Sequence, residues 1–549
     1  MRRRAKLLGI ALAIIVVLAF SVPGERYFDI AKSLDIFATL FKEVNAYYVD
    51  DVDPRKLISI GITGMLESLD PYTDYIPEED IESFSIQTTG QYAGIGALIG
   101  VVNKKIVVTN PYEGFPAHKA GVKVGDEIIS IDGKNVQGKA TSETSALLKG
   151  KPKTEVELVV RREGKKDDLH LKIMRDKIKV ANVVYQGIID GDIGYLKLDD
   201  FTPGAGKEVE EAVVKLKEKG AKKIILDLRD NPGGLLYEAV NIVNVFIPKG
   251  LEVVATKGKV QEWNKSYVTL NNPVDTEIPL AVLTSNGSAS ASEIVAGALQ
   301  DYDRAILVGQ KTFGKGLVQT TRQLAYNAQL KVTTAKYYIP SGRCIQALDY
   351  THRKKDGTVE KFADSLKAEF TTKGGRKVFD GGGLDPDVAV ANEFLGSVSE
   401  ELVTNGFIFE YANKYCGEHP ESPVTMKNFN LTDAEYSRFT NWLMEKNFKY
   451  ATELEKQTDK LIETAKAERH YDELQNQLLA LKSKIDQNHS TDFTRFKDEI
   501  SKILEGEIAF HYRLVAGQTE ISLDKEPEIV QARKMLSDNA AYQKLLSPN

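Results

Sequence analysis

Between residues 183 and 395, apolar segments of strand length alternate with segments of helical periodicity. A helix-like segment at 206–220 (GKEVEEAVVKLKEKG) is followed by the apolar KKIILDLRD, the turn NPGG and a second helix-like segment at 235–247. Such alternation predicts strands joined by crossover helices, and hence a layered α/β core. Because ligands of these cores lie beyond the carboxyl ends of the strands, we expect the functional site in the loops there.

The flanking segments have other periods, and a chain of 549 residues is too long for one hydrophobic core. Apolar residues recur at helical spacing from about 28 to 85, short strands and one helix occupy 90–175, and the tail is helical and charged. The N-terminal helices must bury a face on the core or on a second subunit. We predict a helical N-terminal region, a small β-rich domain, the α/β core and a helical extension, at 25–88, 89–176, 177–395 and 396–549.

Residues 1–24 have the form of an export signal. The basic MRRRAK precedes an apolar run from Leu7 to Phe20. The run is shorter than the ~20 residues of a comfortable membrane span, so a cleaved signal and an uncleaved membrane anchor both fit. A buried N-terminal helix fits poorly beside four cations. We therefore predict an exported protein, periplasmic or anchored on the outer face of the cytoplasmic membrane.

Composition excludes several classes of function. The net charge is −6 and no basic stripe with interleaved aromatic residues is present, which argues against a nucleic-acid partner. Two cysteines exclude a disulfide-rich scaffold and a cysteine-based zinc cluster, and the seven histidines show no metal-ligand spacing. We predict neither a metal site nor a cofactor.

The segment NGSASASEI (286–294) lies where an apolar strand meets a helix. Ser290 and Glu293 fit a capping box, which is a purely structural role. The segment lacks the glycines of a nucleophile elbow, and no histidine lies between 171 and 351 to complete a Ser-His-Asp triad. A serine at the start of a helix is nevertheless suited to nucleophilic attack, because free backbone N–H groups there stabilise an oxyanion.

A base for such a serine occurs in the next strand-end loop, KTFGKGLVQT. Lys315 stands between two glycines in an apolar stretch, whereas Lys311 precedes them and is expected to be solvated. A lysine can deprotonate serine only when burial lowers its pKa well below ~10.4.

Together, SASASEI and FGKGLVQ resemble the carboxyl-terminal processing peptidases, also called tail-specific proteases, in which the two segments have this separation. The resemblance implies a crotonase-like (ClpP/crotonase-type) layered α/β core, with Ser290 as nucleophile, Lys315 as general base and Gln319 orienting the lysine. If 315–319 is a strand, the side chains of Lys315 and Gln319 face the same side of it. The resemblance also implies an oxyanion hole made by the N–H of Ala291 and that of Gly233 or Gly234 in DLRDNPGG.

The segment 89–176 resembles a PDZ domain through GIGALIG and HKAGVKVGDEIISIDGK. PDZ domains bind extended C-termini by strand addition and hold the terminal carboxylate in a nest of backbone N–H groups. Here that loop would comprise Tyr92, Ala93, Gly94 and Ile95. The alternative is a small barrel that only spaces other domains.

These patterns predict a serine endopeptidase that recognises C-terminal tails of exported proteins and cleaves them through an acyl-enzyme. The sequence departs from the minimal family pattern in two places, an insertion at 347–378 and the tail after 395. An adaptor protein and a homo-oligomer are both compatible with these departures. Two rivals remain: a non-catalytic PDZ scaffold of the cell envelope, in which Ser290 only caps a helix, and a crotonase-like enzyme acting on a thioester.

Overall fold

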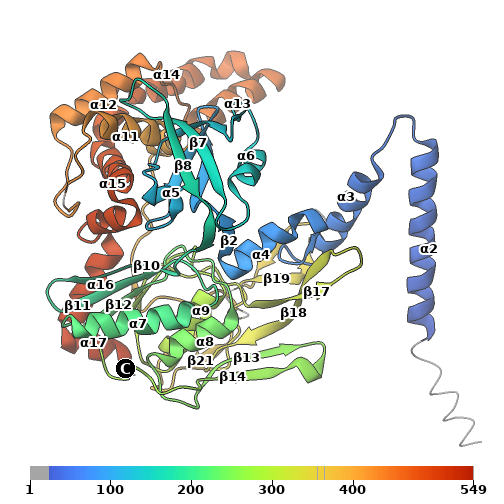
Figure 1. The fold of residues 1–549 in the computed structure, drawn as a ribbon. Coiled ribbons are helices and arrows are strands. Elements are labelled where there is room, and N and C mark those ends of the chain that lie inside the picture. Colours follow the sequence, from blue (N-terminus) through green and yellow to red (C-terminus); the bar gives the residue numbers. More distant parts are fainter. Residues whose placement is uncertain (1–23, 355–356, 364, 366, 424, 548–549) are drawn as a thin grey trace, which may run out of the picture.

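The computed structural model describes residues 24–354, 357–363, 365, 367–423 and 425–547, so the predicted export signal at 1–24 lies outside the described residues except for its last residue. Figure 1 shows a lower α/β core, an upper pair of a small β-domain and a helical domain, and a long helix standing apart. In the described part of the chain, no helix combines the length and the apolar character that crossing a bilayer requires.

The N-terminal region is mainly helical, as predicted, with α2 (Gly24–Tyr47), α3 (Pro54–Glu67), η1 (Glu78–Asp80) and α4 (Ile81–Thr89). The expectation of helix throughout was wrong at β1 (Asp74–Ile76), which pairs with a strand of the core. Of the two partners expected for the helices, the core of the same chain does not cover α2, whose Phe28, Leu34 and Leu40 are 67%, 64% and 57% exposed.

The segment after α4 folds into a small β-domain around one helix. Its strands form a sheet in the order β3-β4-β5-β7-β8, with β6 beside β5, while β2 pairs with β9. The short strands predicted for 90–175 are present, with β4, β5 and β7 in the segments KIVVTN, GDEIISIDG and TEVELVVRREG, and the one predicted helix is α6. The bounds are β2 (Gln91–Gly94), β3 (Ala97–Val102), β4 (Lys105–Pro111), α5 (Pro116–Lys119), β5 (Glu127–Ile131), β6 (Lys134–Asn135), α6 (Thr141–Leu148), β7 (Glu155–Arg161), β8 (Leu169–Met174) and β9 (Asp176–Lys179).

The predicted α/β core is confirmed. Its six-stranded sheet has the order β10-β11-β12-β15-β16-β23, parallel except between β10 and β11. The crossover helices come from the amphipathic segments between the strands. The bounds are β10 (Val183–Ile189), β11 (Ile193–Leu198), α7 (Ala205–Glu218), β12 (Lys223–Asp227), α8 (Leu236–Asn244), β15 (Leu280–Thr284), α9 (Ala291–Asp301), β16 (Ile306–Gly309) and β23 (Val388–Ala389).

Both faces of this sheet are buried, which explains its continuous apolar strands. Along β12, Ile224 and Leu226 face a cluster with α7, α8 and α9, while Ile225 faces a second cluster. That second cluster is completed by Ile529 and Leu536 of the C-terminal tail. The tail therefore supplies one layer of the α/β core.

A second, antiparallel sheet has the order β1-β18-β13-β14, and β17 pairs with β18. The 347–378 insertion forms two hairpins, β19–β20 and β21–β22, and the second hairpin extends to Phe379. The bounds are β13 (Glu252–Gly258), η2 (Gln261–Trp263), β14 (Lys265–Val268), β17 (Leu317–Gln323), β18 (Gln329–Tyr338), β19 (Leu348–Arg353), β20 (Val359–Lys361), β21 (Glu369–Thr371) and β22 (Lys377–Phe379).

The tail is helical, as predicted, and it connects the small β-domain with the core (Figure 1). Asn413 of α11 approaches Gly125 of the β-domain, and the long α15 is broken at Arg513 and Leu514 before α16 reaches the sheet. The bounds are α10 (Ser397–Thr404), α11 (Phe407–Glu418), α12 (Asp433–Glu445), α13 (Glu453–Ala467), α14 (Tyr471–Arg495), α15 (Lys497–Ser522), α16 (Pro527–Ser537) and α17 (Asn539–Leu546).

Candidate active site

Ser290 is half-buried between the carboxyl end of β15 and the first turn of α9, where the sequence placed it. Its φ and ψ are 55° and −113°, which is a strained backbone conformation for a residue with a Cβ. Strain of this kind persists only where the surroundings impose it, and it clusters at functional sites. The segment thus lacks the glycines of a nucleophile elbow but has a strained strand-to-helix turn of the same kind.

The Glu293 carboxylate joins the Ser290 turn to the Lys315 loop. Its Oε2 accepts the backbone N–H of Ser290 and that of Lys315, both at 2.9 Å. Its Oε1 accepts from Gly314 N–H at 2.8 Å and from the Thr312 hydroxyl at 2.6 Å. Burial raises the pKa of Glu293, and these four donors oppose that shift. Glu293 therefore caps α9, as predicted, and also binds the loop that carries Lys315, which sequence reasoning missed.

Tyr337 of β18 makes a second connection between the same two segments. Its hydroxyl lies 2.5 Å from the carbonyl oxygen of Lys315 and 3.2 Å from that of Ser290, and its side chain is buried. Because Tyr337 and Glu293 bind backbone groups, the contact between the two segments does not depend on the side chains of Ser290 and Lys315.

Lys315 lies in the loop before β17 and is largely buried, as a lysine base requires. Burial lowers its pKa to about 8, and the charge of Lys331 acts in the same direction, whereas Glu293 and Asp70 oppose it. The ammonium nitrogen lies 4.4 Å from the centroid of the Tyr72 ring. Among the described residues, no hydrogen bond joins it to Ser290. Lys311 pairs at 2.8 Å with Asp385 near the surface, as expected of the solvated neighbour.

The geometric premise for Gln319 was wrong. Lys315 precedes the strand, because β17 begins at Leu317, and a register irregularity between Val318 and Gln319 breaks the alternation of side chains. Gln319 instead donates from Nε2 to the hydroxyl of Thr333 at 3.1 Å. Its role toward Lys315 stays a prediction.

The NPGG turn packs directly on the Ser290 turn. Gly233 has a φ of 91°, and a Cβ there would lie 2.6 Å from the nitrogen of Ala291, so only glycine fits. Gly233 donates its N–H to Asn231 Oδ1 at 2.9 Å. Gly234 follows, in a bridge with Phe201.

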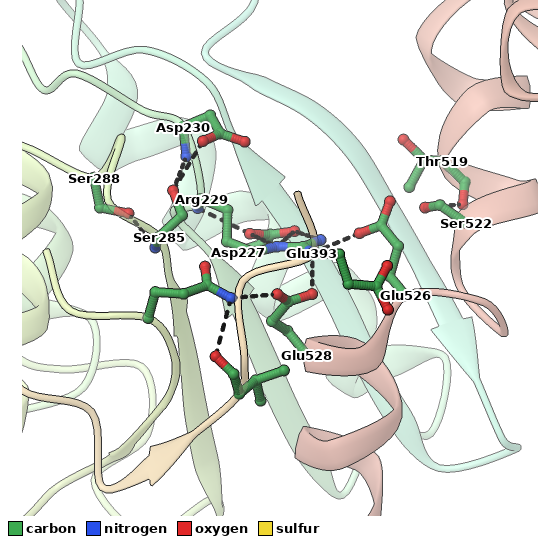
Figure 2. Close-up of polar contacts among 12 residues, drawn as sticks. Asp227, Arg229, Asp230, Ser285, Ser288, Glu393, Thr519, Ser522, Glu526 and Glu528 are labelled. Carbon is green, nitrogen blue, oxygen red and sulfur yellow. Dashed lines mark hydrogen bonds and ion pairs between the residues drawn. The ribbon is translucent and has the colours of Figure 1, made fainter. Parts of the chain in front are cut away.

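Buried serines hold these two turns together. Ser288 donates to the carbonyl of Leu228 at 2.7 Å and Ser292 to that of Asn231 at 2.9 Å, so both hydroxyls have a structural role. Figure 2 shows the neighbouring link, in which the hydroxyl of Ser285 accepts from Asp230 N–H and donates to its carboxylate, at 2.9 Å in each case.

Arg229 connects the NPGG turn to the C-terminal tail (Figure 2). Its guanidinium pairs with Asp227 at 2.6 Å and with Glu526 and Glu528, just before and in α16, at 2.5 and 3.0 Å. Burial acts to raise the pKa of Asp227, but the Arg229 charge holds that pKa below its usual value. Glu528 also accepts from Gln310 Nε2 at 2.6 Å. No local signal in the sequence indicated this long-range network.

Replacing Glu526 and Glu528 together with glutamine is expected to lower the free energy of unfolding by about 2–4 kcal/mol, because hydrogen bonds to a charged group contribute about 1.5–3 kcal/mol each and Asp227 still compensates Arg229. Urea unfolding measures the change. Glu445→Gln, at an exposed carboxylate of α12, is the control and should be neutral. Equal stability of the double variant and the control would contradict a stabilising role for the network.

In the small β-domain, the structure places the predicted tail-binding residues in a strand as well as a loop. Tyr92, Ala93 and Gly94 belong to β2 and pair with β9, so they do not form the open loop that was expected. Tyr92 and Ile95 line a groove of about 300 Å³ between β3 and α6. The strand β3 lies at the edge of its sheet, with Leu98 49% exposed. Sequence reasoning missed β3, α6 and the groove residue Lys149 as parts of this groove.

In the described residues, no group of three or more His, Cys, Asp or Glu side chains is arranged to hold a metal ion.

Comparison with known proteins assigns the three parts of the chain. Peptidase family S41 matches residues 192–352, a PDZ domain matches 107–162, and the family described as "Probable PDZ-protease, C-terminal helical domain" matches 398–536. Among solved structures, the photosystem II D1 C-terminal processing protease is 28% identical, with a TM-score of 0.34, over 66% of this chain and 93% of that one.

Curated relatives are similar over about three-fifths of the chain. A carboxy-terminal-processing protease of Bartonella bacilliformis is 40% identical over 343 residues, 62% of this chain and 78% of the relative. A probable CtpA-like serine protease of Staphylococcus aureus is 39% identical over 341 residues, 61% of this chain and 67% of the relative. The chain therefore belongs to the carboxy-terminal-processing proteases of peptidase family S41, as a serine-type peptidase with a PDZ domain and a helical C-terminal region.

Proposed function

We propose that this peptidase cleaves C-terminal tails of exported proteins with a Ser290–Lys315 dyad. The observation that carries the proposal is the shared carboxylate oxygen of Glu293, which accepts the backbone N–H of both residues and so fixes their segments side by side. The strained φ of Ser290 and the lowered pKa of Lys315 support the same roles.

In the proposed mechanism, neutral Lys315 accepts the hydroxyl proton as Ser290 Oγ attacks the scissile carbonyl carbon. The amine must first come within hydrogen-bonding distance of Ser290 Oγ. The oxyanion is held by Ala291 N–H and by Gly234 N–H, since Gly233 already donates to Asn231. The protonated lysine then gives its proton to the leaving amine, and water deprotonated by Lys315 hydrolyses the acyl-enzyme. Gln319 is proposed to orient the lysine once the lysine side chain has turned toward Ser290.

We further propose that the PDZ domain binds the substrate tail as an additional strand on β3. An edge strand offers unpaired N–H and C=O groups, and the apolar wall of the groove accepts apolar side chains. The terminal carboxylate would lie near Ile95 at one end of the groove, within the predicted segment 92–95.

The crotonase-like classification of the core, an exported location and the division of the chain at 24, 88, 176 and 395 belong to the same proposal. The uncovered apolar face of α2 supports association with a second copy or with a membrane surface near the N-terminus. An adaptor protein is compatible with the C-terminal helices, and nucleic acid has no part in the proposal.

The tail-recognition step is tested with an unfolded protein ending in apolar residues and the same protein ending in acidic ones. Filling the groove by Ser145→Trp is expected to raise KM for the apolar-tailed substrate about tenfold or more, because the tail loses its site, while cleavage of a short untailed peptide is unchanged. Ala146→Trp, on the exposed side of the same helix, is the matched control. Equal KM values for both variants would show that tails do not bind in this groove.

A further inference from the structure

The Tyr72 ring lies against the amine of the proposed base. Its centroid is 4.4 Å from Lys315 Nζ, a distance at which the face of an aromatic ring attracts an ammonium group. Tyr72 belongs to the segment between α3 and β1, about 240 residues earlier in the chain than the lysine. The contact therefore joins the N-terminal region to the active site.

A tight turn holds Tyr72 on its N-terminal side. The Asp70 carboxylate accepts the backbone N–H of Tyr72 and that of Thr73, each at 2.8 Å, and the Thr73 hydroxyl at 3.1 Å. The same hydroxyl accepts Thr333 N–H of β18 at 3.2 Å, and β1 continues the pairing with that strand. Asp70 and Thr73 are 6% and 5% exposed, so this turn is part of the core.

The insertion at 347–378 holds the Tyr72 ring from another side. Tyr350 of β19 contacts it edge-on, with ring centroids 6.2 Å apart and planes at 87°. In the same hairpin, Arg353 donates from Nη2 to the carbonyl of Glu67 at the end of α3, at 2.9 Å. The insertion is thereby fixed to the segment that carries Tyr72.

We propose that Tyr72 is a positioning residue for Lys315, and that the insertion acts on the base through Tyr350 and Tyr72. The inference rests on the proposed function, since it requires Lys315 to be the base. The ring face stabilises the ammonium form and excludes water from one side of the amine. The other charged groups facing Lys315 are Lys331 on β18, Glu293 on α9 and Asp70 in the turn. Lys331 disfavours the ammonium form and the two carboxylates favour it, and the Tyr72 ring acts in the same direction as the carboxylates.

The test compares Tyr72→Phe with Tyr72→Leu in the full-length protein, using cleavage of an untailed peptide from pH 6 to pH 10. Phenylalanine keeps the ring face and should retain the wild-type profile. Leucine keeps an apolar surface but loses the ring face, so the ammonium is less stable. We expect the pH at which activity rises to fall by about half a unit to one unit, and the plateau kcat to fall about tenfold with KM unchanged.

Tyr350→Leu should move both quantities in the same direction by a smaller amount, because Tyr72 keeps its turn but loses one wall. The matched control is Tyr471→Leu, which removes a half-buried ring 5.1 Å from Lys466 in the C-terminal helices and should change neither quantity. If Tyr72→Leu fails to fold in a thermal-unfolding measurement, Tyr350→Leu decides the matter alone.

The outcomes separate this inference from the proposed function. If Lys315→Met and wild type cleave at equal rates, the dyad itself is wrong. If Lys315→Met is inactive while folded Tyr72→Leu and Tyr350→Leu keep the wild-type plateau and pH profile, the dyad stands and the positioning role of Tyr72 is wrong. A loss of kcat in Tyr72→Phe equal to that in Tyr72→Leu would also overturn the role of the ring face.

Discussion

Replacing Ser290 with alanine is expected to lower kcat for peptide cleavage by about a million-fold, the scale seen when a serine nucleophile is removed from a peptidase. Lys315→Met should lower it about 10²- to 10⁴-fold, the usual contribution of a general base. In the wild type, activity should rise with pH through about 8, because the lysine pKa is lowered to that value and only the neutral amine accepts a proton. Single-turnover cleavage of a fluorogenic peptide measures all three.

The second lysine of the loop provides a matched control for this prediction. Lys311→Met removes a cation paired near the surface and should leave the rate unchanged. Tail binding should survive in Ser290→Ala, since the groove lies in another domain. A non-catalytic scaffold predicts instead that Ser290→Ala and Lys315→Met retain every activity of the wild type, and cleavage at the wild-type rate by Ser290→Ala would rule out the dyad.

Glu293→Gln is expected to lower kcat about 100-fold although Glu293 touches no substrate in the proposed mechanism. The carboxylate accepts four donors, whereas an amide offers one oxygen and turns an NH₂ toward the remaining donors. The Ser290 and Lys315 segments should then separate, and misplacement by about 1 Å is enough for a loss of this size. Each buried donor left without an acceptor should also lower the free energy of unfolding by about 1–3 kcal/mol.

A second carboxylate distinguishes a loss of alignment from a general loss of stability. Glu208 of α7 accepts three hydrogen bonds from Asn182 and Val183, far from Ser290 in the chain and outside the proposed mechanism. Glu208→Gln should lower the free energy of unfolding while kcat at 25 °C is retained. If both variants lose stability but Glu293→Gln keeps its kcat, the shared carboxylate is structural only.

Local sequence predicted the α/β core well, because each strand and helix of 183–395 has its own apolar period and its own turn residues. It also predicted that the Ser290 and Lys315 segments follow successive strands of the chain. The structure pairs these strands, β15 and β16, so that their carboxyl ends meet at one edge of the sheet. The common acceptor, Glu293, was visible only as a capping residue, because its contacts with Thr312 and Gly314 depend on how two loops meet.

The errors arose where backbone pairing overrides local pattern. Spacing alone put Gln319 on the same face as Lys315, but the register irregularity at Val318 is set by pairing with β18. Tyr92 to Gly94 were expected in a loop and are paired with β9, some 85 residues later in the chain. Contacts such as Tyr72 with Lys315 and Arg229 with Glu528 join segments that no window of sequence contains together.

The link between Arg229 and Glu528 has a consequence for how the protein is made. The two residues are 299 positions apart, so at ordinary rates of synthesis the second emerges roughly 15 to 60 s after the first. Until then, the arginine beside the NPGG turn lacks its partners on α16, and one face of the central sheet is uncovered. We expect the catalytic core to finish folding, and the enzyme to become active, only after α16 has been synthesised.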